Sequence, residues 1–149
     1  MKIAIGSDHA GFRAKEALKA SLAQAGYVLE DVGTRTEESC DYPDFAIKVA
    51  DTVAKKTADK GIILCGTGIG SSIAANKVAG VRAALVHDGF TAEMSRRHND
   101  ANVLCLGARV LADERIRDLA RLWLETPFDG GRHDRRVGKI MEYDSHRRC

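Results

Sequence analysis

Short apolar runs alternate along the chain with longer stretches in which apolar residues recur every three or four positions. Runs such as Ile3–Ser7 and Gly61–Cys65 are brief and rich in β-branched residues, which is typical of buried strands. Tyr42–Lys56 instead carries Phe45 and Val49 at four-residue spacing, which predicts an amphipathic helix. The pattern therefore predicts strands and helices in alternation.

This alternation continues from one end of the chain to the other. Strands are expected at Ile3–Ser7, Tyr27–Val32, Gly61–Cys65, Arg82–Val86 and Asn102–Leu106. Helices are expected at Gly11–Gly26, Tyr42–Lys56, Ser71–Val78, Thr91–His98, Asp113–Glu125 and Asp134–Arg147.

Regular alternation of this kind favours an α/β fold, here a three-layer α/β/α sandwich with a five-stranded parallel sheet. Right-handed crossovers leave few topologies, and we predict the Rossmann-like or flavodoxin-like strand order 2-1-3-4-5. No repeat or linker divides the sequence, so residues 1–149 are expected to form a single domain. Its last part, about 132–147, is expected to be a basic helical segment.

The predicted order also locates a ligand site. In an open parallel sheet of order 2-1-3-4-5, ligands bind at the carboxyl ends of strands 1 and 3, where the order reverses. The first strand ends at Asp8 and His9, and the third ends in the run Cys65–Ser72. The two segments richest in reactive side chains are thus expected to meet at one crevice.

Composition narrows the class of protein without identifying it. The formal charge is +2, from 23 basic and 21 acidic residues, which favours neither nucleic acid nor a membrane surface as a partner. The apolar start is too short for a signal peptide, and no run approaches the ~20 apolar residues of a membrane span. The four cysteines form no CxxC pair and no zinc pattern, so we expect reduced thiols in a cytoplasmic protein. Three of them are expected in a surface turn (Cys40), a core strand (Cys105) and an exposed tail (Cys149).

The run that begins at Cys65 contains Gly66, Gly68 and Gly70 before a predicted helix. Alternating glycines let backbone N–H groups converge on an anion or on developing negative charge, and the helix start favours a thiolate. An inert buried cysteine beside an ordinary turn is the alternative. Ser71 stands where a tyrosine-phosphatase loop needs Arg and a dinucleotide fingerprint needs Gly, and no P-loop lysine is present.

Other candidate residues each have a plain structural alternative. Asp8 is equally suited to capping a helix, and His9 to a solvated loop. His98 and Asn99 close a predicted helix, where a histidine is favoured electrostatically, but an imidazole also suits acid–base work on a sugar oxygen. In the basic segment, Arg132 and Arg136 share one helix face and are suited to clamping a phosphate, and Arg109 is a third candidate anion ligand.

Five segments together resemble the ribose-5-phosphate isomerase B family, in its order and with its spacing, over nearly the whole chain. They are GSDHAGF (6–12), DYPDFA (41–46), ILCGTGIGSSIAANKVAGVRAAL (63–85), SRRHNDANVLCLGARV (95–110) and GGRHDRRV (130–137). The resemblance implies interconversion of D-ribose 5-phosphate and D-ribulose 5-phosphate in the non-oxidative pentose phosphate pathway, without metal or organic cofactor. It also implies a homodimer, or a tetramer, with active sites shared between subunits.

The resemblance also implies residue roles. Cys65 matches the base, Thr67 a supporting hydroxyl, His98 the group for ring opening, and Asp8 a group that assists the sugar hydroxyls. Gly66, Gly68, Ile69, Gly70 and Ser71 match the loop around the enediolate, and Tyr42 lines the same site. His9, Arg132 and Arg136 match phosphate ligands, while His98, Asn99 and Arg109 are expected to come from the partner subunit.

Two other functions stay open at this point. A related isomerase of a tetrulose or hexose phosphate, of the galactose-6-phosphate or allose-6-phosphate type, would use the same residues. A non-catalytic module that binds a phosphorylated ligand would use the glycine loop and the arginines, but it would not need Cys65 or His98.

Overall fold

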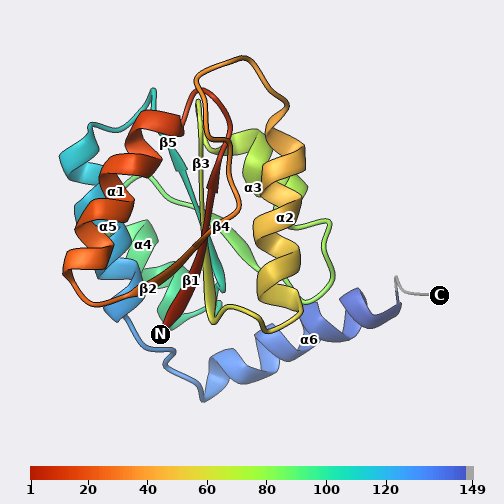
Figure 1. The fold of residues 1–149 in the computed structure, drawn as a ribbon. Helices are drawn as coiled ribbons and strands as arrows, with labels where there is room; N and C mark the ends of the chain where they lie inside the picture. The colour runs from red at the N-terminus through yellow and green to blue at the C-terminus, as the bar shows by residue number, and fades with distance from the viewer. Residues whose placement is uncertain (147–149) are drawn as a thin grey trace.

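The computed structural model describes residues 1–146, in which five parallel strands form one sheet with helices on both faces (Figure 1). The strands are β1 (Lys2–Ser7), β2 (Val28–Asp31), β3 (Lys60–Cys65), β4 (Ala83–Leu85) and β5 (Val103–Gly107). The helices are α1 (Phe12–Gln24), α2 (Tyr42–Ala54), α3 (Ile69–Ala75), α4 (Gly89–Arg97), α5 (Asp113–Glu125) and α6 (Arg132–His146). Every predicted strand and helix is present, and the α/β sandwich is confirmed. Arg147, the predicted end of the last helix, and Cys149 lie outside the described residues.

Each face of the sheet packs against its own set of helices. Helices α1, α4 and α5 cover one face, where Leu18, Leu104 and Trp123 share a buried apolar cluster (Figure 1). Helices α2 and α3 cover the other, around a second cluster that includes Val49 and Cys105. Burial of these apolar side chains at ~25 cal/mol per Å² is the main term that stabilises the sandwich. Cys105 is a core residue, as predicted.

The strand order is β2-β1-β3-β5-β4, so the predicted order 2-1-3-4-5 is wrong for the last two strands. Right-handed crossovers explain the exchange, because they tie the face on which a helix packs to the direction in which the chain moves across the sheet. Helix α4 packs against α5, on the same face as α1. The step from β4 to β5 therefore runs in the same direction as the step from β1 to β2, back toward the centre.

The burial of the two strands agrees with this exchange. All five residues of β5 are buried, whereas the three residues of β4 are only partly buried. A continuous apolar run is typical of a strand covered on both faces, and the shorter strand that follows Arg82 suits an edge.

The reversal of strand order still lies between β1 and β3, as the predicted position of the ligand site requires. Ser7 pairs with Leu64, and Cys65 pairs with Gly107 on the other side. The ends of β1, β3 and β5 are therefore neighbours at the carboxyl edge of the sheet.

Helix α6 lies across the opposite edge, beneath the start of β1 (Figure 1). The amide of Gly80 donates to Asp144 Oδ2 at 2.6 Å, and Arg82 Nη1 lies 3.2 Å from Met141 Sδ. These contacts attach α6 to the segment that enters β4. Within residues 1–146, no helix combines the length and the apolar character needed to cross a membrane.

Candidate active site

Cys65 is the last residue of β3, and its buried thiol points into the turn that begins α3. The Gly68 amide donates to Sγ at 3.1 Å, and Ser71 Oγ lies 3.2 Å from the same sulfur. Ser71 Oγ also donates to the Gly68 carbonyl at 3.1 Å, so with that bond in place the Cys65 S–H is the donor to Ser71. If the thiol loses its proton, the Ser71 hydroxyl can turn and donate to sulfur. Two donors are thus available to a thiolate.

Gly68 has the backbone conformation that brings its amide to the sulfur. Its φ is +80°, in the left-handed region, and it is the N-cap of α3. A Cβ at this position would lie 2.5 Å from Leu85 Cδ1 and 3.1 Å from the Leu106 carbonyl carbon. Both the conformation and the close approach therefore require glycine.

Two predicted ligands pack on the other glycines of this loop. A Cβ at Gly70 would lie 2.5 Å from the Tyr42 ring, so the ring rests directly on that backbone. A Cβ at Gly66 would be 3.5 Å from Arg109, whose amide also donates to the Gly66 carbonyl at 2.9 Å. Arg109 thus lies beside the Cys65 loop of its own chain. This placement differs from the expectation that Arg109 reaches in from a partner.

Asp8 and His9 follow β1 on the other side of Cys65. The Asp8 carboxylate is buried and accepts the Gly11 amide at 3.0 Å, which holds the turn before α1. Gly11 rather than Asp8 is the N-cap of this helix, so Asp8 is not the helix cap of the structural alternative. His9 Nδ1 lies 3.2 Å from both the amide and the carbonyl of Cys40. Because one is a donor and the other an acceptor, His9 keeps a backbone partner in either protonation state. The loop at Cys40 therefore orients a predicted phosphate ligand, a role the sequence did not indicate.

Thr67 and Ile69 complete this half of the site at the surface. Thr67 is exposed, and its Oγ1 accepts the Ile69 amide at 3.3 Å. A hydroxyl that accepts one hydrogen bond can still donate its own proton to a ligand.

The remaining predicted residues lie at the opposite edge of the sheet. His98 caps the C-terminus of α4, Asn99 follows it, and Arg132 and Arg136 are exposed on the first turns of α6. The five residues of β5, at ~3.4 Å each, separate this group from Arg109 by about 17 Å. A single chain therefore does not bring both groups around one small ligand.

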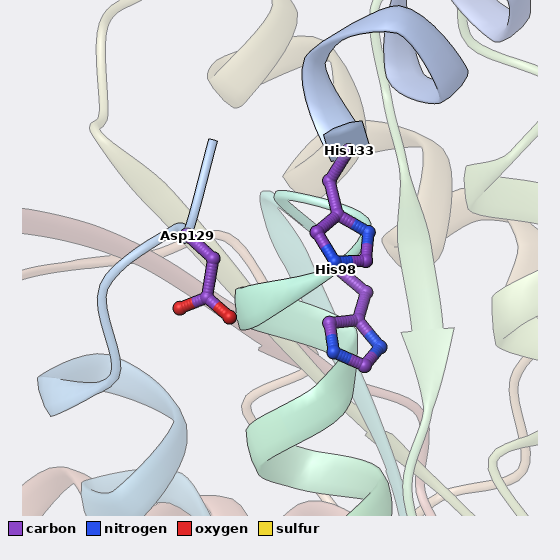
Figure 2. Close-up of side chains that lie close together, drawn as sticks. All are labelled: His98, Asp129 and His133. Atoms are coloured by element: carbon purple, nitrogen blue, oxygen red, sulfur yellow. The ribbon is translucent and has the colours of Figure 1, made fainter. Parts of the chain in front are cut away.

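His98 has neighbours that the sequence did not predict. Its ring stacks on His133 with centroids 4.2 Å apart and planes 6° from parallel, and the Asp129 carboxylate lies beside both rings (Figure 2). Burial, together with the charges of His98, Arg132 and Arg136, lowers the pKa of His133. Nothing in the spacing of positions 98 and 133 points to this contact, because it depends on the path of residues 126–131.

A cavity also lies at the amino edge of the sheet. It has a volume of about 530 Å³ and is lined in part by Lys56, Lys60 and Asp100. Burial lowers the pKa of Lys60 to about 8. This cavity does not include Cys65.

Comparison with known proteins places the chain in a family. The model of the family described as Ribose/Galactose Isomerase matches residues 3–140. The chain belongs to the ribose/galactose isomerase family.

Members of this family are similar to the chain over its full length. Ribose-5-phosphate isomerase B of Escherichia coli is 44% identical over 146 residues, which are 98% of each chain. The structure of Clostridium thermocellum ribose-5-phosphate isomerase B matches with a TM-score of 0.96 and 51% identity, covering 98% of this chain and 99% of the other. A Mycoplasma genitalium ribose-5-phosphate isomerase B with bound ribulose-5-phosphate matches with a TM-score of 0.93 and 43% identity, over 97% and 96%.

Isomerases of this kind need a base, a means of stabilising an oxyanion and a grip on the substrate. The carboxyl-edge group offers a thiol with two donors, a loop of close-packed glycines, and the cation of Arg109. The amino-edge group offers an imidazole pair and two exposed arginines. The chemistry of the two groups is complementary, although they lie on opposite edges of one chain.

Proposed function

We propose that this protein interconverts D-ribose 5-phosphate and D-ribulose 5-phosphate, with Cys65 as the base. The observation that carries the proposal is the position of Cys65 Sγ, 3.1 Å from the Gly68 amide and 3.2 Å from Ser71 Oγ, in a chain of the ribose/galactose isomerase family. These donors stabilise the thiolate that must accept a proton from carbon.

The reaction moves one proton between neighbouring carbons. The Cys65 thiolate takes the proton from C2 of the open-chain aldose, and the C2–H bonding electrons form the C1–C2 double bond of an enediolate. Electrons of the aldehyde C=O move to its oxygen, which the backbone amides after Gly66 and the Thr67 hydroxyl are placed to stabilise. Each such donor is commonly worth ~3 kcal/mol in the transition state. A second proton passes from the C2 hydroxyl to the C1 oxygen, the thiol returns its own proton to C1, and the C2 oxygen becomes the ketone carbonyl.

The other side chains bind and orient the sugar phosphate. Arg109, His9 and the two arginines of α6 are suited to the phosphate, which does not react, so their binding energy orients C2 against the sulfur. Asp8 and Tyr42 border the sugar. His98 serves ring opening, because the aldose is mostly cyclic in water and its ring must open before C2 becomes acidic. No step requires a metal or an organic cofactor.

A shared site in a homodimer joins the two groups. Parallel strand geometry keeps His98, Arg132 and Arg136 about one strand length from Cys65 within a chain. A twofold axis would place the amino-edge group of one subunit beside the carboxyl-edge group of the other, forming two equivalent sites. Ile69, Ile73 and Val110, each more than half exposed, surround the Cys65 loop with apolar surface that suits a protein interface.

Mixing two inactive variants tests the shared site. If Cys65 and His98 of one site come from different subunits, hybrids of Cys65→Ala and His98→Asn regain one intact site each. Random exchange should then restore about a quarter of the wild-type turnover. No restoration, in mixtures that mass spectrometry shows to contain hybrids, would exclude the shared site.

Substitution of Cys65 tests the base directly. Cys65→Ala should lose nearly all turnover of ribose 5-phosphate while still binding it in a calorimetric titration, because the phosphate ligands remain. Cys65→Ser keeps the size and the hydrogen bonds but has too high a pKa to act as the base, so it should be nearly as inactive. Turnover that survives both substitutions would exclude Cys65 as the base.

A hexose phosphate is the second candidate substrate, because the matching family is described by both ribose and galactose isomerases. Turnover compared across four-, five- and six-carbon aldose phosphates distinguishes them. A kcat/KM for the five-carbon substrate below that for either other length would overturn the assignment.

A further inference from the structure

The residue that faces His98 most closely is a second histidine. His133 is buried at the start of α6, whereas His98 is partly exposed at the end of α4. Their rings lie almost parallel, 4.2 Å apart, as Figure 2 shows. Stacking of this kind restricts rotation of the more exposed ring about its side-chain bonds.

Arg132 favours one protonation state of His133. Its Nε–H points at His133 Nε2 from 3.4 Å, and a guanidinium can only donate. This contact favours an unprotonated Nε2, and hence a neutral His133 ring with its proton on Nδ1. The lowered pKa of His133, from burial and from the charges of His98, Arg132 and Arg136, agrees with this assignment.

A neutral ring against His98 has a chemical consequence. When His98 takes a proton from a sugar hydroxyl during ring opening, the resulting imidazolium faces the π surface of a neutral imidazole, which is a favourable arrangement. The Asp129 carboxylate beside both rings adds a negative charge to the same surroundings. Asp129 is itself held by its amide, which donates to the Arg97 carbonyl at 3.1 Å, and its Oδ1 lies 3.8 Å from Arg97 Nη1.

Two histidines and a carboxylate are also a common set of metal ligands, with ligand atoms here within 4.8 Å of one another. The ring geometry argues against that use. Ligand lone pairs lie in the plane of each ring, so two stacked rings direct them within separate, parallel planes rather than at a common point. One nitrogen of His133, Nε2, faces the Arg132 guanidinium instead.

We propose that His133 is a positioning residue for ring opening, which stacks on His98 and presents a neutral face to it. The inference rests on the proposed function, and it assigns to His133 a role that involves no contact with the phosphate. This role of His133 affects only one of the two substrates. Ribose 5-phosphate closes through its C4 hydroxyl, whereas ribulose 5-phosphate carries its phosphate on the only hydroxyl that could close a five-membered ring, and so it stays open.

The direction of reaction is therefore the diagnostic measurement. In His133→Ala, turnover measured from ribose 5-phosphate should fall by about 10- to 100-fold, the range expected when a catalytic group loses its alignment. The kcat measured at saturating ribulose 5-phosphate should change less than about threefold, since that substrate needs no ring opening and its open-chain product can close in solution. His133→Phe keeps a flat ring against His98 and should restore most of the activity from ribose 5-phosphate.

His146→Ala is the matched control, because it removes an exposed histidine from the same helix. It should leave both directions unchanged, and thermal unfolding of each variant separates lost folding from lost alignment. If His133→Ala lowers both directions equally, His133 contributes to phosphate binding or to folding, and the positioning role is wrong. Unchanged turnover in both directions would also overturn it. Either result leaves the proposed function intact. The proposed function fails only if the wild-type protein does not isomerise ribose 5-phosphate.

Discussion

Gly68→Ala tests the link between backbone conformation and the proposed base more directly than any other single change. The substitution adds one methyl group at a position with φ +80°, where an L-residue costs about 1–2 kcal/mol. It also places that methyl 2.5 Å from Leu85 Cδ1 and 3.1 Å from the backbone of Leu106. Overpacking of this kind costs about 1–3 kcal/mol more. The free energy of unfolding should therefore fall by about 2–5 kcal/mol in total.

Gly26→Ala separates the two contributions. Gly26 has a φ of +87°, close to that of Gly68, but a Cβ there meets nothing within 4 Å. It should lose only the conformational part, about 1–2 kcal/mol. Urea denaturation at equal protein concentrations measures both variants, and the concentrations must match because an oligomer's stability depends on them.

Activity adds a second readout for the same pair. Relief of the clash must move the loop, and this movement takes the Gly68 amide away from Cys65 Sγ. Gly68→Ala should therefore lose turnover, whereas Gly26→Ala should keep it. If Gly68→Ala is no less stable than Gly26→Ala, close packing against Leu85 does not determine the conformation of this loop. Full activity in Gly68→Ala would show that the amide contributes nothing to the base.

Three further predictions concern single groups. Ser71→Ala removes the hydroxyl that lies 3.2 Å from Cys65 Sγ. It should lower kcat by about tenfold with little change in KM, as expected for a donor used in the transition state. An equal rise in KM would contradict this role. Burial alone would raise the pKa of Asp31, but the ammonium groups of Lys15 and Lys19 hold it below its usual value. The folded state thus favours the Asp31 carboxylate. The resulting stabilisation is present above the unfolded pKa of ~3.9 and is lost as the pH falls further. Urea midpoints measured between pH 6 and pH 3 should therefore fall more steeply for wild type than for Asp31→Asn. Burial lowers the pKa of Lys60 to about 8, below the unfolded ~10.4, so the folded state binds fewer protons between these values and stability should rise with pH there. Lys60→Met should remove that rise and stabilise the protein by about 1 kcal/mol at pH 7. A loss of stability in thermal unfolding would show instead that favourable contacts of the Lys60 ammonium outweigh the cost of burying it.

The pattern of residues predicted the helices and strands well because each one carries its own signal. Continuous apolar runs such as those of β3 and β5 are distinct from the four-residue spacing of α2, and the glycines after Cys65 mark a sharp turn. The proximity of the ends of β1 and β3 also followed from the sequence, since the carboxyl ends of neighbouring parallel strands share one edge. Cys65, Ser71 and Gly68 could be grouped in this way because they are close in the chain.

Contacts between distant segments were decided only in three dimensions. The order of β4 and β5 depends on which face α4 covers, and that face is determined by packing against α5 rather than by any local pattern. The stack of His98 on His133 joins two helix ends whose relative position depends on the whole chain between them. The sequence by itself determined which side chains are candidates for the chemistry, because residue type and local spacing are properties of short segments. Only the tertiary structure divided them between the two edges of the sheet, because the length and direction of the parallel strands keep those edges apart.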